Sequence, residues 1–173
     1  MSFALWLTGL PASGKSAIAR ELLAQLHGRG IDAAVLESDV LRTQLTPFQR
    51  YDREERDFFY ATLAHLAEHL AAKGTPVIVD ATANLRAYRD AARARVSRFA
   101  EVYVDTPPEV CAARDPKGLY RAAREGRSAT LPGLQAAYEP PLAPELTVRG
   151  DLGTPAQAAA RVADWLTARG WLA

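Results

Sequence analysis

One eight-residue stretch near the start of this 173-residue chain constrains its fold more than any other feature. An apolar run at residues 3–8 ends in a glycine-rich turn, and helical periodicity begins at residue 16. Between them the chain reads Gly9-Leu10-Pro11-Ala12-Ser13-Gly14-Lys15-Ser16, which fits the pattern G-x-x-x-x-G-K-[ST]. Loops of this kind wrap a polyphosphate with backbone N–H groups, and the positive end of the following helix dipole points at the anion. The stretch therefore predicts a phosphate-binding loop between a buried strand and a helix.

Two side chains of this phosphate loop, residues 9–16, have predicted roles in binding a nucleotide. Lys15 would reach the β- and γ-phosphates, and Ser16 would hold Mg²⁺. We therefore expect ATP and Mg²⁺ as cofactors. The alternative is a glycine turn beside a surface lysine, and the strand–loop–helix context argues against it.

Apolar runs and helical patterns alternate along the rest of the chain. Further strands are predicted at residues 33–36, 76–79, 101–104 and 146–149. Helices are predicted at residues 54–73, 88–99 and 155–169, the last capped by Thr154. Strands that alternate with helices build a mainly parallel sheet with helices on both faces. We expect an α/β fold with five strands and, from the length, a single domain over residues 1–173.

Residues 105–144 interrupt this alternation and are too long for a plain connection. The segment is rich in proline and in basic residues, namely Arg114, Lys117, Arg121, Arg124 and Arg127. We interpret it as a mobile basic lid of the same domain, whose cations would converge on bound phosphates.

Two carboxylates follow predicted strands. Asp39 comes after the second strand and Asp80 ends the third. Because ligands of open parallel sheets bind beyond the carboxyl ends of the strands, both would face the phosphate loop. We expect Asp39 to accept the proton of an attacking hydroxyl and Asp80 to hold Mg²⁺, with the reverse assignment open. The alternative is a pair of turn-forming aspartates.

Composition excludes several classes of protein. The chain carries 21 basic and 20 acidic residues, a net charge of +1, so a nucleic acid is not expected as partner. No apolar run approaches the roughly 20 residues that span a bilayer, so no membrane is expected either. The single cysteine, Cys111, excludes an intramolecular disulfide and fits a reducing, cytoplasmic location. We expect Cys111 to be buried as a small apolar residue.

Three motifs occur in the same order as in the adenylylsulfate kinase (APS kinase) family, which this chain resembles over nearly its whole length. They are the phosphate loop, Arg-Asp-Pro-Lys-Gly-Leu-Tyr at residues 114–120, and Tyr-Glu-Pro-Pro at residues 138–141. The resemblance implies a P-loop kinase-type three-layer α/β sandwich with a basic lid. It also implies transfer of the γ-phosphate of ATP to the 3′-hydroxyl of adenosine 5′-phosphosulfate, a step of sulfate assimilation.

The resemblance also implies roles for single residues. Asp39 and Arg42 are retained from the family's Asp-Gly-Asp-Asn-x-Arg motif, and Asp52-Arg53 matches its Asp-Arg pair. Catalysis would rest on Lys15, Asp39, Arg42 and Lys117, and ATP would be bound by residues 9–16 and Arg114. The acceptor, an anionic small molecule, would be held by Asp39, Arg42, Arg53, Arg56, Arg86, Lys117 and Leu131.

The chain departs from the family at the acceptor end of the predicted site. Val40 and Arg56 each stand where the family has asparagine, and Ala83 replaces a serine. Leu131 replaces a phenylalanine that packs on an adenine ring in the family. We expect Arg56 to point inward with Arg53, because residues three apart share a helix face. The alternatives are a kinase for another small-molecule or nucleotide hydroxyl, and a non-catalytic nucleotide-binding regulator.

Two other patterns carry minor alternatives. One is the H-x-x-E-H pattern of zinc proteases, which is matched by His65-Leu66-Ala67-Glu68-His69. The alternative is that His65 and His69 are two ordinary surface histidines without a metal. Trp165 and Trp171 lie close together near the end of the chain. We expect them to pack on the sheet, and the alternative is that they form the contact between two copies in a homodimer.

Overall fold

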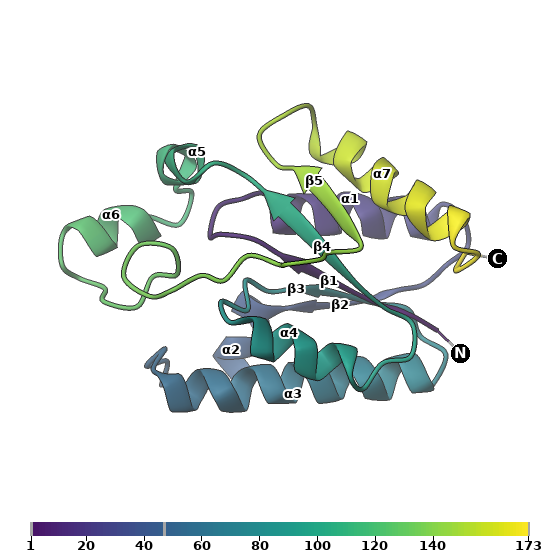
Figure 1. The fold of residues 1–173 in the computed structure, drawn as a ribbon, viewed down its shortest axis with the longest axis horizontal. Coiled ribbons are helices and arrows are strands. Elements are labelled where there is room, and N and C mark those ends of the chain that lie inside the picture. The colour runs from purple at the N-terminus through teal and green to yellow at the C-terminus, as the bar shows by residue number, and fades with distance from the viewer. Residues whose placement is uncertain (1, 47, 173) are drawn as a thin grey trace.

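The computed structural model describes residues 2–46 and 48–172 (Figure 1). Its strands are β1 (Ala4–Thr8), β2 (Ala34–Glu37), β3 (Val77–Asp80), β4 (Phe99–Asp105) and β5 (Leu146–Arg149). Its helices are α1 (Lys15–His27), α2 (Ser38–Leu45), α3 (Arg53–Ala72), α4 (Arg86–Arg93), α5 (Pro108–Arg114), α6 (Leu119–Arg124) and α7 (Pro155–Ala168).

The strands form one parallel sheet in the order β2-β3-β1-β4-β5. The central strand β1 pairs with both β3 and β4, so that Leu5 lies beside Ile78 and Ala100. From β1 the chain passes to one side for β2 and β3 and to the other side for β4 and β5. The phosphate loop, which follows β1, therefore opens at the switch point where open α/β sheets bind their ligands. The predicted five-stranded parallel sheet is confirmed.

Alternate side chains of β1 enter two separate cores, because successive residues of a strand point to opposite faces. Leu5 and Leu7 pack with residues of α1 and α7, whereas Trp6 packs with residues of α3 and α4. Figure 1 shows these two helix pairs on opposite faces of the sheet. The predicted three-layer α/β arrangement is thus confirmed.

The boundary between α4 and β4 corrects one expectation. A helix was expected over residues 88–99, but α4 ends at Arg93 and Phe99 begins β4. Phe99 lies opposite Ala4 in the sheet, and its ring packs on Trp6 with 6.5 Å between centroids. The pairing of Phe99 and the residues after it with β1 therefore decides that this stretch is a strand, although its apolar residues have helical spacing.

Helix α2 was not predicted, although it places a candidate catalytic residue. It follows β2 without a loop and carries Asp39 in its first turn. Leu41 and Leu45, one turn apart, pack against the core on the α3 side of the sheet. That i, i+4 spacing was a short helical signal in the sequence.

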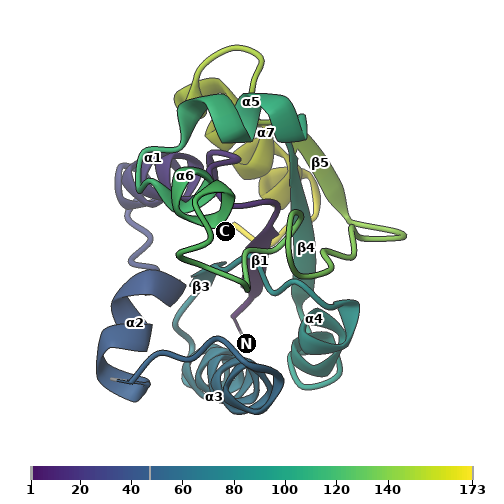
Figure 2. The ribbon, with the colours of Figure 1, turned by 90° about the vertical axis from the view of Figure 1, so that its left-hand side faces the viewer.

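The predicted lid, residues 105–144, contains α5 and α6 and has a small core of its own. Cys111, Tyr120, Ala123 and Leu131 are buried together, with Leu10 of the phosphate loop packed against them. Burial raises the pKa of the Cys111 thiol. The expected burial of Cys111 is confirmed, and the lid rests on the phosphate loop beyond the ends of the strands (Figure 2).

The two tryptophans near the end of the chain pack on the protein itself. Trp171 stacks on Phe3 with 5.9 Å between ring centroids, and Trp165 contacts Trp171 edge-on at 5.3 Å. Both lie against the core formed by α1 and α7.

The histidine pair on α3 is exposed and lacks the surroundings of a zinc site. Glu68 of the pattern pairs with Arg95 at 3.2 Å. In residues 2–46 and 48–172 no group of three or more His, Cys, Asp or Glu side chains is placed to hold a metal ion. Over the same residues, no helix is both long and apolar enough to cross a membrane.

Candidate active site

The phosphate loop is held from behind by two other strand ends. Gly14 precedes α1 with a left-handed φ of 106°, a conformation that favours glycine. Thr106, after β4, donates a hydrogen bond of 2.8 Å to the Ser13 carbonyl. Gly150, after β5, approaches the same carbonyl so closely that a Cβ there would lie 2.0 Å from it. The loop is therefore fixed by contacts that only the folded sheet supplies.

Lys15 is the first residue of α1, and its side chain is folded back over the loop. Its ammonium donates hydrogen bonds to the carbonyls of Gly9 (3.0 Å) and Leu10 (2.9 Å). Burial lowers the pKa of Lys15, while the negative charges of Asp80 and Asp39 oppose that shift. The charge of Lys15 thus lies in a site of low polarity, where it acts strongly on a nearby anion.

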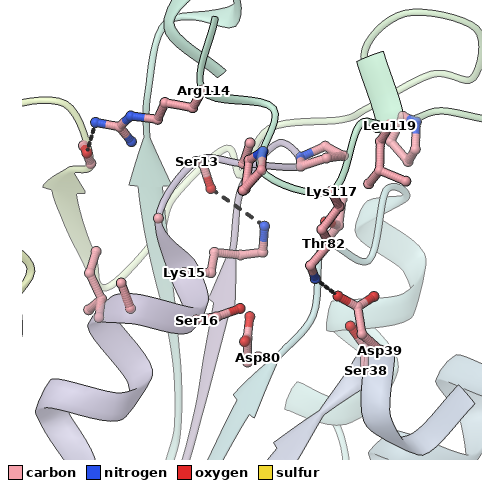
Figure 3. A pocket seen from close by; sticks show the side chains of 18 of the residues that line it. Ser13, Lys15, Ser16, Ser38, Asp39, Asp80, Thr82, Arg114, Lys117 and Leu119 are labelled. Atoms are coloured by element: carbon pink, nitrogen blue, oxygen red, sulfur yellow. Dashed lines mark hydrogen bonds and ion pairs between the residues drawn. The ribbon is translucent and has the colours of Figure 1, made fainter. Parts of the chain in front are cut away.

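Ser16 and Asp80 together offer oxygen ligands beside the loop. Asp80 ends β3 and is 4% exposed, and Ser16 lies in the first turn of α1. Figure 3 shows the Ser16 hydroxyl and the Asp80 carboxylate facing one another. Mg²⁺ prefers one or two such oxygens together with waters and phosphate oxygens, so this donor set fits that ion.

Asp39 and Lys117 form an ion pair that joins the lid to α2 (Figure 3). Both side chains are more than half exposed. Partial burial lowers the pKa of Lys117, but the Asp39 carboxylate and the more distant Asp80 outweigh it and hold that pKa above its usual value. Both residues of this pair line the cavity beside the phosphate loop.

A cavity of about 890 Å³ extends from the phosphate loop in two directions. One end is bounded by Arg114 and residues 149–155, and Arg114 donates a hydrogen bond of 2.8 Å to the Gly150 carbonyl. The other end lies between α2, the start of α3 and the lid. Its lining includes Arg42, Tyr51, Arg56, Tyr60, Thr130 and Leu131.

Two buried arginines line the end of the cavity between α2, α3 and the lid, and in the described part of the chain only one of them is paired with a carboxylate. Arg42 is 3% exposed, pairs with Glu55 at 2.8 Å and lies 3.9 Å from the centroid of the Phe59 ring. Arg56 is 7% exposed and donates a hydrogen bond of 2.6 Å to the Thr130 carbonyl of the lid. Among the described residues Arg56 has no carboxylate partner. Because an unpaired buried charge is costly, an anion bound in the cavity would stabilise the Arg56 guanidinium.

The structure brings together most of the residues that the sequence singled out. The cavity lining includes Pro11, Ala12, Ser13, Gly14, Lys15, Ser16, Asp39, Arg42, Arg56, Asp80, Arg114, Lys117 and Leu131. Gly9 and Leu10 lie behind it, accepting hydrogen bonds from Lys15.

Arg53 and Arg86 were expected in the acceptor site but lie outside the cavity lining. Arg53 is exposed and pairs with Asp57 at 2.8 Å, so it does not share the inward direction of Arg56. The Arg86 side chain donates to the Pro140 carbonyl at 2.8 Å, and its backbone N–H donates to the Glu139 carboxylate at 2.8 Å. Arg86 therefore anchors the Tyr138–Pro141 segment instead of lining the cavity.

Sequence reasoning missed Arg89, which joins three segments behind the site. Arg89 is 1% exposed and pairs with Glu101 of β4. It also donates hydrogen bonds to the carbonyls of Ala83, after β3, and Glu139, at the end of the lid. The neighbouring Tyr138 places its hydroxyl 3.1 Å from that of Thr8, the last residue of β1 before the phosphate loop. Arg89 is one of several arginines of α4, and the sequence gave no signal that it, rather than the others, joins these segments.

The comparisons with known proteins agree with one another. The model of the family described as Adenylylsulphate kinase matches residues 1–149. An adenylyl-sulfate kinase of Microcystis aeruginosa is 38% identical over 168 residues, which are 97% of this chain and 93% of that protein. An APS kinase of Mycobacterium tuberculosis, solved in complex with AMPPNP and APS, is 35% identical with a TM-score of 0.90. The similarity to that structure covers 96% of this chain and 98% of the other.

Proposed function

This chain belongs to the adenylylsulfate kinase family, and from that premise we propose that it transfers the γ-phosphate of ATP to the 3′-hydroxyl of adenosine 5′-phosphosulfate (APS). The product is 3′-phosphoadenosine 5′-phosphosulfate. The observation that carries this function is one continuous cavity with the phosphate loop in its middle and, at one end, the buried Arg56, which has no carboxylate partner among the described residues. Such a cavity has room for a nucleotide triphosphate on one side of the loop and an anionic acceptor on the other.

On the nucleotide side, the backbone of the phosphate loop binds the ATP phosphates and Lys15 stabilises the transferred phosphoryl group. Arg114 and residues 149–155 enclose the remainder of the nucleotide. Ser16 and Asp80 would hold Mg²⁺, which neutralises phosphate charge when it is bound. The burial of Asp80 next to Lys15 and Ser16 supports this role over that of a base.

On the acceptor side, Asp39 takes the proton of the 3′-hydroxyl. The 3′-oxygen forms a bond to the γ-phosphorus, the bond from that phosphorus to the bridging oxygen of ADP breaks, and the proton passes to the Asp39 carboxylate. For this step Asp39 must separate from Lys117, whose ammonium then turns to the phosphates. The exchange supplies a cation where charge develops, which is the main protein contribution to phosphoryl transfer.

The acceptor is proposed to be held by its anionic groups. Arg56 has no carboxylate partner in the described part of the chain, so a phosphosulfate group completes its charge balance. Arg42 adds a second positive charge on the same wall, although Glu55 neutralises part of it. Arg53 and Arg86 do not take part in this contact, because neither lines the cavity.

The function is tested by incubating the purified protein with ATP, Mg²⁺ and APS and measuring ADP and the 3′-phosphorylated product together. We expect both to form in equal amounts and only when APS is present. Adenosine 5′-monophosphate, sugars and other hydroxyl compounds serve as comparison acceptors. Faster turnover of one of these would identify a kinase for another hydroxyl, and binding of ATP without turnover would identify a regulator.

The Lys117→Ala variant is expected to turn over APS on the order of 100-fold more slowly, because it lacks one cation of the transition state. Its melting temperature should stay near that of the wild type, since an exposed ion pair contributes only about 0–1 kcal/mol. Lys73→Ala, at the exposed end of α3, is the matched control and should behave as wild type.

Limited trypsin digestion of the wild-type protein tests whether the lid closes when ligands bind. Cleavage in residues 115–135 should slow when ATP and APS are bound, because the lid then closes on both ligands. Equal cleavage with and without ligands would contradict a closing lid.

The Arg56→Asn variant is expected to raise the KM for APS roughly 10- to 100-fold, because a buried charge-assisted hydrogen bond contributes about 1.5–3 kcal/mol. The KM for ATP should not change. Arg53→Ala, on the same helix but outside the cavity, should leave both constants at the wild-type value. A larger effect of Arg53→Ala than of Arg56→Asn would contradict the placement of the anion beside Arg56.

We make three further proposals, on the domain organisation, the location and the oligomeric state of the protein. The chain is proposed to be one domain, because both cores pack on one sheet. Its buried, unpaired Cys111 is consistent with a reducing location such as the cytoplasm. A homodimer is testable by light scattering, and the partly buried Trp165 and Trp171 remain candidates for its contact.

A further inference from the structure

The part of the lid that lines the acceptor end of the cavity is a compact loop, residues 128–136, here called the lid loop. It is organised around the side-chain amide of Gln135, which donates hydrogen bonds to the carbonyls of Ser128 and Ala123. The same amide accepts a hydrogen bond of 3.3 Å from the Leu131 N–H, and the Leu131 carbonyl accepts one of 2.9 Å from the Gln135 N–H. We therefore expect the lid loop to move as one body.

The lid loop is seated on the phosphate loop through Leu10. The side chain of Leu10 packs against the small core of the lid, which includes Tyr120 and Leu131. Gly133 has a left-handed φ of 86° and approaches Leu10 so closely that a Cβ on Gly133 would overlap the Leu10 Cδ2. Beside this contact, the Tyr120 hydroxyl donates a hydrogen bond of 2.9 Å to the Pro11 carbonyl. Leu10 and Gly133 both lie outside the cavity lining, so their contact acts on a ligand only through other residues.

The backbone of Leu10 belongs to the nucleotide side of the site. Its carbonyl accepts hydrogen bonds from the Lys15 ammonium at 2.9 Å and from the Ser13 N–H at 3.1 Å. To stabilise a transferred phosphoryl group, Lys15 must turn from this carbonyl toward the phosphates of ATP. The binding of ATP therefore removes a hydrogen-bond partner from the residue whose side chain holds the lid loop.

The lid loop also forms one wall of the acceptor end of the cavity. The residues that it contributes to the lining are Ser128, Thr130, Leu131 and Pro132. The Thr130 carbonyl accepts the hydrogen bond of 2.6 Å from Arg56, so the position of the lid loop fixes the position of this guanidinium. A chain of direct contacts thus runs from Lys15 through Leu10 and the lid loop to Arg56.

We propose that Leu10 is a positioning residue that couples the two ends of the cavity, so that ATP bound at the phosphate loop raises the affinity of the acceptor end for APS. This inference rests on the proposed function and adds to it a residue whose side chain lies outside the cavity lining. When Lys15 leaves the Leu10 carbonyl, Leu10 shifts the lid loop through Gly133 and brings Arg56 into place for the anion. Because coupling between two sites is reciprocal, APS also raises the affinity for ATP.

The test measures the Kd of APS by calorimetry with and without a saturating non-hydrolysable ATP analogue. In the wild type the analogue should lower this Kd by about fivefold or more, the lower end of typical coupling between sites. In Leu10→Ala the analogue should leave the Kd of APS unchanged, because the shortened side chain no longer reaches Gly133. Leu10→Met keeps an apolar side chain of similar volume and should retain the wild-type ratio of the two Kd values. Leu134→Ala, at an exposed position of the same lid loop, is the matched control and should also retain it.

Gly133→Ala tests the same contact from the lid side. Its methyl group would overlap Leu10 on a left-handed backbone, so the lid loop must shift and the ratio should fall. In the Leu10→Ala background the same substitution should cause no further change in the ratio, because the two substitutions act on one contact. Tyr120→Phe removes only the hydrogen bond to the Pro11 carbonyl and should lower the ratio too, which keeps the test valid if Leu10→Ala does not fold.

Three results would overturn the inference while leaving the kinase function intact. One is a wild type that forms the 3′-phosphorylated product but binds APS equally well with and without the analogue. Another is the wild-type ratio in Leu10→Ala, or in Tyr120→Phe where that is the variant that folds. The third is an equal fall of the ratio in Leu134→Ala, which would show a general loosening of the lid. If the wild type forms no 3′-phosphorylated product from APS, the proposed function fails and the inference fails with it.

Discussion

Lys15→Ala is expected to reduce the turnover number with APS by more than 100-fold. The loss of one preorganised charge at the transition state costs on the order of 3 kcal/mol or more, which is about this factor in rate. Lys15 is the cation of the phosphate loop, and its burial strengthens its interaction with the transferred phosphoryl group. The measurement is kcat at saturating ATP and APS.

Stability distinguishes this effect from unfolding. The pKa of Lys15 is lowered by burial, so the unfolded chain binds its proton more tightly and the charge of Lys15 opposes folding at neutral pH. Removing it should therefore not lower the melting temperature. Lys15→Met, which keeps the aliphatic stem, checks that packing is not the cause, and Lys73→Ala is the exposed control. Wild-type turnover by a folded Lys15→Ala protein would refute the assignment of the phosphate loop.

Arg89→Met is expected to lower the free energy of unfolding by about 3–5 kcal/mol, because it leaves the Glu101 carboxylate buried without its main partner. Arg93, at 3.6 Å from Glu101, compensates in part, so the lower end of that range is expected. For a domain of this size the melting temperature should fall by roughly 6–15 °C. Urea unfolding of both proteins measures the difference.

A double variant separates the charge effect from general damage to the core. Glu101→Leu in the Arg89→Met background removes both buried charges and should recover part of the lost stability. Arg95→Met, whose ion pair with Glu68 is much more exposed, is the control and should change stability by less than about 1 kcal/mol. Equal losses in the free energy of unfolding in Arg89→Met and Arg95→Met would show that the buried Arg89–Glu101 pair contributes no more to stability than an exposed ion pair.

The parts of the fold that depend on local patterns were predictable. Strand β5 and the Thr154 cap of α7 lie where the sequence placed them, because capping and strand periodicity are properties of neighbouring residues. The end of α4 was not found, because the apolar stretch before β4 fits both helix and strand until pairing with β1 decides. Helix α2 was not found either, because its eight residues give only a short helical signal.

The sequence by itself determined the phosphate loop, the alternation of the five strands with the longer helices, and the basic lid motif. The loop and the lid motif are short runs whose residue types indicate one ligand chemistry, and the alternation is visible in the periodicity of neighbouring residues. Which arginines face the acceptor was decided only by the tertiary structure. Arg56 and Arg53 share a helix and a charge, but Arg56 meets Thr130 of the lid, 74 positions away, whereas Arg53 meets its neighbour Asp57 in solvent. Contacts between residues so distant in sequence form only when the sheet, α3 and the lid have packed, and no local pattern records them.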